Sequence, residues 1–238
     1  WIFSLLPGNQ LQTPVLAAEL ANRIGRKPFV AIIGEDHDSR SFMGELNRSL
    51  AKNVLAPQFQ FVYRPTDAEN SDLARRALQS QPAAVLLVAD ARGSARLVRE
   101  LRAASFKGEI FGGPAMGRRR FLEEAGPAAE GAVVPSLVEP GEKWPAFEGT
   151  FQKRFQRSPD FAAAGTYDAV QLLVAAVRQA GLNRARIGDA LRALSPWDGV
   201  AGPVRWDTLG GNRRPARLGI VADGRLARLD GSLGTGVP

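Results

Sequence analysis

The fold of this chain is decided by residues 28–41, which read Pro28-Phe-Val-Ala-Ile-Ile-Gly-Glu-Asp-His-Asp-Ser-Arg-Ser41. Residues 29–33 form an unbroken apolar run rich in β-branched side chains, which is typical of a strand buried on both faces of a parallel sheet. The run breaks at Gly34 into a polar loop, and apolar residues then recur at helical spacing at positions 42, 43, 46 and 50. The stretch therefore predicts a strand, a loop and a helix, the unit whose loop opens a ligand crevice in open α/β sheets.

The same alternation of strands and helices runs from Trp1 to Ser136. We expect further strands at 1–6, 58–63, 83–89, 109–112 and 132–136. The intervening helices are expected after Thr13 (as N-cap, with Pro14 in the first turn and Gly25 as the stop), from Asp67 or Asn70 to Gln79, at 94–104 and at 119–125. This order predicts an α/β fold with a doubly wound parallel sheet and right-handed crossovers.

Between about Pro140 and Ala201 the sequence pattern predicts mainly helices. Helices are expected at 142–155, from 161 or 162 to 180, and at 186–194. The middle helix is apolar nearly all round and is therefore expected to be buried, although no strand in this stretch supplies a sheet for it. Its sheet is either the first one or lies outside this chain. The tail returns to strands at 203–206, 217–221 and 226–229, with a hairpin turn at Asp223-Gly224 and a disordered end at 231–238.

Composition narrows the classes of function. The absence of cysteine excludes disulfides, thiolate catalysis and cysteine-ligated metal. The net charge of +7 comes mainly from scattered arginines, without aromatic interleaving or a recognised motif, so we expect no nucleic-acid binding. No apolar run approaches the ~20 residues of a membrane-spanning helix, so we expect no membrane insertion of this chain.

Four stretches, taken in order, resemble the type I periplasmic solute-binding proteins, in particular the leucine/isoleucine/valine-binding branch that serves ABC importers. They are residues 27–45, Glu130-Gly-Ala-Val-Val-Pro135, Pro159-Asp-Phe-Ala-Ala-Ala-Gly-Thr-Tyr-Asp-Ala-Val170, and Gly199-Val-Ala-Gly-Pro-Val-Arg-Trp-Asp207 ahead of Asp223-Gly224. The resemblance implies a non-enzymatic protein without a cofactor. It also implies a periplasmic or extracytoplasmic location, and two partners, a small-molecule solute and the membrane permease of an ABC transporter.

Members of this family have two α/β lobes joined by three crossings of the chain. The sequence starts at Trp1 without a methionine or a signal peptide, so we interpret it as a fragment that lacks the N-terminal part of such a protein. The resemblance then assigns residues 1–133 and 204–238 to the second lobe. It assigns residues 137–201 to the helical part of the first lobe, whose sheet is missing from this chain.

The resemblance places ligand contacts in the loops after successive strands of the second lobe. Carried over by position, the candidate residues are Asp38, Ser39 and Arg40, then Asp90, Ala91 and Arg92, then Ala115 and Met116, with Phe161 from the first lobe. An arginine can pair with a carboxylate, Asp90 with an amine, and Phe161 can cover an apolar group. For each residue the alternative is a solvated loop side chain.

Two departures from the branch bear on the ligand. Ser39-Arg40 stands where amino-acid binders often have an aromatic residue before a glycine, and Ala115 stands where they often have a glutamate that holds the ammonium group. We therefore expect an organic acid, an amide or an aromatic compound rather than a branched-chain amino acid.

Two other functions stay open at this point. The same fold serves as the ligand-sensing domain of receptors and transcription regulators. The pair Asp36 and Asp38 around His37 also weakly resembles the nucleophile loop of the haloacid-dehalogenase-like phosphotransferases, although Gly34 and Glu35 separate it from the strand. An Asp-dependent hydrolase is thus the second alternative, while a lone loop histidine is usually just solvated.

Overall fold

The computed structural model describes residues 2–65 and 72–229, and its contacts divide the chain into two compact units. Unit 1 comprises Trp1–Leu11 and Leu137–Ala216, and unit 2 comprises Gln12–Ser136 and Arg217–Pro238. The sequence placed the last division near 201–204, whereas the chain leaves unit 1 at Ala216. The difference arises because residues 202–204 pair within unit 1 and do not join the sheet of unit 2.

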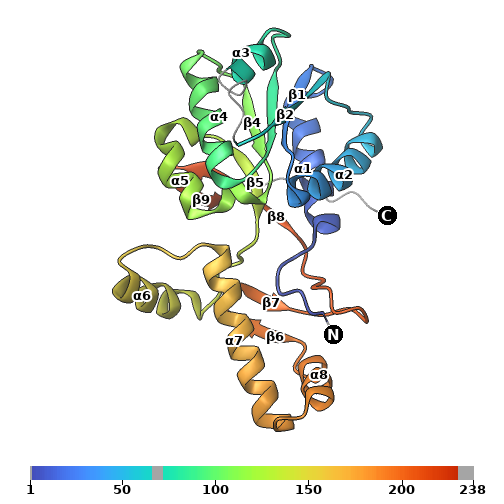
Figure 1. Ribbon diagram of the computed structural model, residues 1–238, viewed down its shortest axis with the longest axis vertical. Helices are drawn as coiled ribbons and strands as arrows, with labels where there is room; N and C mark the ends of the chain where they lie inside the picture. The colour runs from blue at the N-terminus through green and yellow to red at the C-terminus, as the bar shows by residue number, and fades with distance from the viewer. Residues whose placement is uncertain (1, 66–71, 230–238) are drawn as a thin grey trace. The chain divides into compact units, whose positions relative to one another are not determined.

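Unit 2 is built on a sheet whose strand order, over the described residues, is β2-β1-β3-β4-β5-β8-β9 (Figure 1). The strands are β1 (Phe29–Gly34), β2 (Phe59–Tyr63), β3 (Ala84–Val88), β4 (Glu109–Gly112), β5 (Val133–Ser136), β8 (Arg217–Ala222) and β9 (Arg225–Arg228). Strands β1 to β5 run parallel, and β8 and β9 are antiparallel to their neighbours. The predicted α/β class and doubly wound sheet are confirmed, with an antiparallel edge added by the tail.

Helices cover both faces of this sheet (Figure 1). They are α1 (Asn9–Ile24), α2 (His37–Lys52), α3 (Leu73–Leu78), α4 (Ala91–Ala103) and α5 (Arg119–Ala125). One core joins the α1 and α2 side chains to alternate strand residues such as Phe29 and Leu86, and the other joins α3, α4 and α5 to the intervening residues such as Val30 and Val85. The continuous apolar runs of β1 and β3 are thus buried on both faces, as their sequences predicted.

Unit 1 holds the remaining helices and a hairpin. Its elements are α6 (Trp144–Phe155), α7 (Phe161–Ala180), α8 (Arg184–Ala193), β6 (Trp197–Gly199) and β7 (Gly202–Val204), the last two paired antiparallel. The predicted helix 161–180 is confirmed, and its apolar surface is only partly buried within this chain. Along α7 the buried residues are Ala164, Asp168, Leu172 and Ala176, and the other faces of the helix are more exposed.

Two local predictions near the N-terminus are wrong. Residues 2–6 form no strand, because their backbone bonds instead to a loop, with the Ser4 N–H donating to the Gly210 carbonyl at 2.8 Å. Thr13 is not an N-cap. The helix already begins at Asn9, and the Thr13 hydroxyl is buried at 3.0 Å from that of Ser49 in α2.

The predicted end of the first helix and the predicted hairpin turn are both confirmed. Gly25 ends α1 with a φ of +59°, and Asp223-Gly224 turns β8 into β9 with positive φ at both residues, as a type I′ hairpin turn requires. The predicted helix starts at Asp67 and Asn70, the predicted end at 231–238 and Trp1 lie outside the described residues.

Candidate ligand-binding site

The loops that follow β1, β3 and β4 lie next to one another at the carboxyl edge of the unit 2 sheet. Ile33 pairs with Val88 and Leu87 pairs with Gly112, so the three strands end side by side. The strand order reverses between β1 and β3, which makes this edge the topological switch point where open α/β sheets bind ligands. The structure thus brings together the three loops that the sequence proposed separately.

The first loop is organised by Asp36, which caps α2. Its carboxylate accepts the Ser39 N–H at 2.9 Å and the Ser39 hydroxyl at 2.6 Å. Burial alone would raise the pKa of Asp36, but the hydrogen bonds from the Ser39 hydroxyl and from backbone N–H groups outweigh it and hold this pKa below its ordinary value. Ser39 is therefore buried in the cap, whereas Asp38 is exposed and Arg40 turns back to donate to the Glu35 carbonyl.

The second loop repeats this arrangement. Asp90 caps α4 by accepting the Arg92 N–H at 2.9 Å and the Gly93 N–H at 3.1 Å. The Arg92 side chain is exposed, with its Nε 3.5 Å from a Glu124 carboxylate oxygen, and Ala91 is half-buried. Both aspartates at the switch point thus occupy helix N-termini, whose N–H groups would otherwise attract a ligand's anion.

The third loop splits the two residues assigned to it. Ala115 is half-buried at the edge, but Met116 is fully buried in the core beside α4 and α5. The methionine folds inward because Gly112 leaves room for it, since a Cβ there would lie 1.9 Å from the Met116 sulfur. Met116 is therefore a core residue and not an exposed contact. Phe161 begins α7 in unit 1 and is half-buried.

Tyr63 is a residue at this edge that the sequence analysis missed. It ends β2, is 5% exposed, and packs so closely on Gly93 that a Cβ there would lie 2.3 Å from its ring. Burial, reinforced by the negative charge of Asp90, raises the pKa of Tyr63. Its position as the last residue of a strand was the signal available in the sequence, because the ends of parallel strands share one edge.

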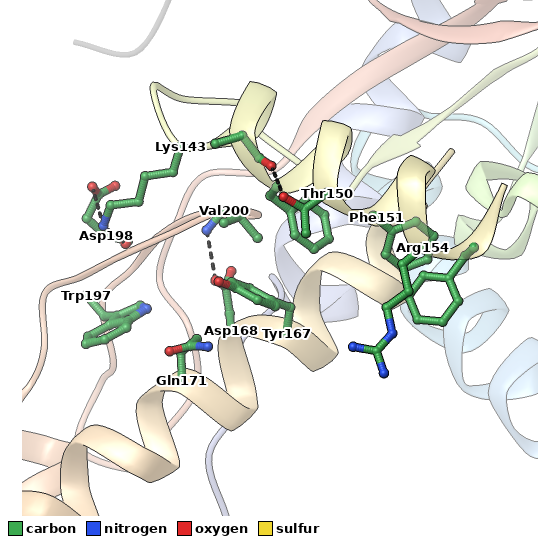
Figure 2. Close-up of a pocket in the computed structure, with 13 residues that line it drawn as sticks. Lys143, Thr150, Phe151, Arg154, Tyr167, Asp168, Gln171, Trp197, Asp198 and Val200 are labelled. Atoms are coloured by element: carbon green, nitrogen blue, oxygen red, sulfur yellow. Dashed lines mark hydrogen bonds and ion pairs between the residues drawn. The ribbon is translucent and has the colours of Figure 1, made fainter. Parts of the chain in front are cut away.

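Unit 1 contains a cavity of about 670 Å³ that the sequence did not predict (Figure 2). An aromatic row from α6 forms one wall, with ring centroids 5.8 Å apart for Phe147 and Phe151 and 4.5 Å apart for Phe151 and Phe155. Tyr167 of α7 adds a ring 5.0 Å from Phe147. Phe155 and Tyr167 are 47% and 44% exposed, so the cavity opens onto an apolar surface.

The aspartates of the first loop, Asp36 and Asp38, are the basis of the hydrolase alternative. Among residues 2–65 and 72–229 there is no cluster of three or more metal-ligating side chains. Asp36, the candidate nucleophile, has both carboxylate oxygens bonded to Ser39 and serves as a helix cap.

Comparison with known proteins identifies the family. A family model described as periplasmic binding protein matches residues 1–225. This chain belongs to that family. The family and the similar solved structures are solute-binding proteins and not enzymes. No curated protein sequence matches the chain.

Three solved structures show the same fold. A leucine-binding protein from Thermotoga maritima is 21% identical, with a TM-score of 0.83 over 94% of this chain and 66% of its own. A substrate-binding protein from Desulfitobacterium hafniense in complex with leucine is 23% identical, with a TM-score of 0.75 over 95% and 67%. A solute-binding protein from R. palustris in complex with benzoate is 19% identical, with a TM-score of 0.81 over 95% and 64%. The chain thus spans about two thirds of the length of these proteins.

Proposed function

We propose that this chain is the solute-binding component of an ABC importer and captures a small organic ligand at the carboxyl edge of the unit 2 sheet. The observation that carries this proposal is the meeting of the β1, β3 and β4 loops at the switch point. In this family the output of binding is a change of shape that a membrane permease reads. We accordingly propose an extracytoplasmic location. In the described part of the chain, the helices are too short or too polar to cross a membrane.

We propose an acidic or amide ligand rather than an amine, because the carboxylate of Asp90 is engaged as the cap of α4. The two caps also close the Ser39, Arg92 and Gly93 N–H groups to a ligand carboxylate, so a side chain has to supply the positive charge. The Arg92 guanidinium is exposed, and its contact with Glu124 is long. We propose that it pairs with a carboxylate of the ligand. Ala115 offers no charge that would hold an ammonium group.

The proposal predicts a thermal shift of the whole protein with one class of small molecule. The panel contains leucine, other amino acids, benzoate, aliphatic acids, amides, nucleotides with Mg²⁺, and short DNA. A ligand at 100 times its dissociation constant should add about 2.7 kcal/mol of stability. Arg92→Ala should remove most of the shift, because it deletes the cation proposed to pair with the ligand.

Arg99→Ala is the matched control, since Arg99 is exposed on the same helix two turns further on. Asp90→Asn tests the charge of Asp90 and keeps an oxygen that can cap α4, whereas alanine would remove the cap. A shift that survives Arg92→Ala, or a response to DNA or nucleotide alone, would contradict the proposal.

We also propose that unit 2 is the second lobe, and that the helices of unit 1 belong to a first lobe whose sheet these residues do not contain. Large apolar side chains on α7 support this proposal. Those that are more than a third exposed are Tyr167, Val170, Leu173 and Val174. A helix with such a surface normally packs against another layer, because exposed apolar surface on this scale costs free energy in water.

The 238-residue chain should therefore bind a hydrophobic dye strongly, with the signal coming from α7. The paired substitution Val170→Gln with Leu173→Gln should lower the dye fluorescence at least about twofold, because it removes two side chains that are 54% and 51% exposed. The control pair is Phe59→Gln with Val62→Gln on β2, where both side chains are 50% exposed. A chain that binds no dye, or that responds equally to both pairs, would overturn the missing-sheet proposal.

A further inference from the structure

Two buried charged side chains hold the turn between β6 and β7 from opposite sides. Asp168 of α7 is 2% exposed and accepts the Val200 N–H at 2.8 Å and the Ala201 N–H at 2.9 Å (Figure 2). Arg214 is 4% exposed and donates from Nη1 to the Ala201 carbonyl. Ala201 is thus held at its N–H by a carboxylate and at its carbonyl by a guanidinium.

Arg214 also holds a segment that comes from the division between the units. Its Nη2 donates to the Leu137 carbonyl at 2.7 Å, and Leu137 is the first residue after the chain leaves unit 2. Arg214 itself lies two residues before Ala216, where the chain returns to unit 2. The Glu139 N–H donates to the Ala201 carbonyl at 3.0 Å, so the same carbonyl accepts from both segments.

Asn212 ties in the remaining segment. Its Nδ2 donates to the Leu5 carbonyl at 2.5 Å, and its Oδ1 accepts the Arg214 N–H at 3.0 Å. Leu5 lies shortly before Leu11, where the chain first passes from unit 1 into unit 2. All three segments that lead to or from unit 2 are therefore bonded to one cluster inside unit 1, which consists of Ala201, Asn212 and Arg214.

The buried bonds around Ala201 require an arginine at position 214 and a carboxylate at position 168. A guanidinium offers several N–H donors in a planar fork, which suits two carbonyls at once, whereas an ammonium is a single point charge. Burial raises the pKa of Asp168, although its two backbone hydrogen bonds and the positive charges of Lys143 and Arg214 act against this. Removing Arg214 would leave the buried carbonyls of Ala201 and Leu137 without their charged donor, and removing Asp168 would leave the Val200 and Ala201 N–H groups without their acceptor.

We infer that Asp168 and Arg214 are positioning residues of the hinge, which clamp Ala201 and thereby hold the three crossing segments in fixed register. Bending is then confined to the residues beyond the clamp, at 11–12, 136–137 and 216–217. This inference rests on the proposed function, because only a protein that changes shape on ligand capture has use for a defined hinge.

Hydrogen exchange of single amides in the whole, ligand-free protein tests the clamp. Arg214→Met should speed exchange at the Ala201 amide, which bonds to Asp168 and not to Arg214. Asp168→Asn should in turn speed exchange at the Glu139 amide, which Asp168 does not touch. Each of these increases in exchange rate should be at least about tenfold. In the double variant, the increase at each amide should be smaller than the product of the increases in the two single variants.

Arg213→Met is the matched control, because Arg213 is the exposed neighbour of Arg214. Arg214→Lys should speed exchange at the Ala201 amide by less than Arg214→Met does, since it keeps the positive charge and loses the planar guanidinium. If Arg214→Met does not fold, Arg214→Lys and Asp168→Asn together provide the test. Effects confined to the amides that each side chain bonds directly, or effects that multiply in the double variant, would overturn the clamp. Because no ligand is present, that result leaves the proposed function standing. A failed thermal-shift panel would instead remove the hinge role of the clamp, while the coupled exchange of the Ala201 and Glu139 amides would still be observed.

Discussion

Replacing Gly202 by alanine is expected to lower the free energy of unfolding of unit 1 by at least about 3 kcal/mol. Gly202 has a φ of +111°, which side-chain-bearing residues rarely adopt, and such strain costs about 1–3 kcal/mol. A Cβ would also lie 2.0 Å from Arg214 Nη1 and 3.1 Å from the Glu139 carbonyl oxygen. The guanidinium cannot move aside without giving up its buried carbonyl partners, and a hydrogen bond that involves a charged group contributes about 1.5–3 kcal/mol.

Tryptophan fluorescence during urea unfolding measures this effect. Trp144, Trp197 and Trp206 belong to unit 1, and the sequence of unit 2 contains no tryptophan. Gly149→Ala is the control, because Gly149 lies in α6 of the same unit with nothing within 4 Å of a Cβ. That substitution should be neutral or stabilise by up to about 1 kcal/mol. An unfolding midpoint for Gly202→Ala equal to that of the wild type would contradict the close packing of the clamp.

Phe111→Ala is expected to destabilise unit 2 by about 3–5 kcal/mol. Phe111 lies in β4, is 0% exposed, and packs in the core formed with α1 and α2. Its removal leaves a cavity among neighbours that cannot collapse fully around it. Because β4 leads into the loop of Ala115, we also expect a weaker thermal shift with any ligand of the proposed site.

Far-ultraviolet circular dichroism during urea unfolding reports this loss, since the strands and helices of unit 2 provide much of the signal. Phe59→Ala is the matched control, a phenylalanine in the edge strand β2 that is 50% exposed. It should cost about 1 kcal/mol or less. Equal midpoints for the two variants would mean that β4 is not the packed central strand that the structure shows.

Several elements could be predicted from the sequence because their signals are local. The apolar runs of β1 and β3 need burial on both faces, and the positive φ values at Asp223 and Gly224 suit the residues found there. The three candidate loops came from the family resemblance, and the sequence contributed the strand ends at which they lie. The sequence did not show which side chains of those loops are buried. Met116 is an example, because it can pack into the core only where Gly112 has no Cβ.

The predictions that failed concern segments whose structure depends on contacts with residues far away in the sequence. Residues 2–6 have an apolar pattern that suits a strand, yet their partner is the loop around Gly210 and Asn212 and not a sheet. Thr13 precedes a proline as an N-cap often does, but the helix extends back to Asn9 and Thr13 packs against Ser49. The apolar sequence of α7 showed that the helix needs a covering layer, but it did not show whether this chain supplies that layer.

By itself, the sequence determined the α/β class, most of the strands and helices of the sheet unit, and the resemblance that family comparison confirmed. Hydrophobic periodicity, capping residues and turn residues act over a few positions, so they can be recognised along the chain. The tertiary structure alone decided the antiparallel pairing of β6 with β7 and the clamp on Ala201. Its contacts join residues 13, 33 and 77 positions apart, and no local propensity favours such pairs. They form because a buried carboxylate and a buried guanidinium must find partners, and only the folded chain brings those partners within reach.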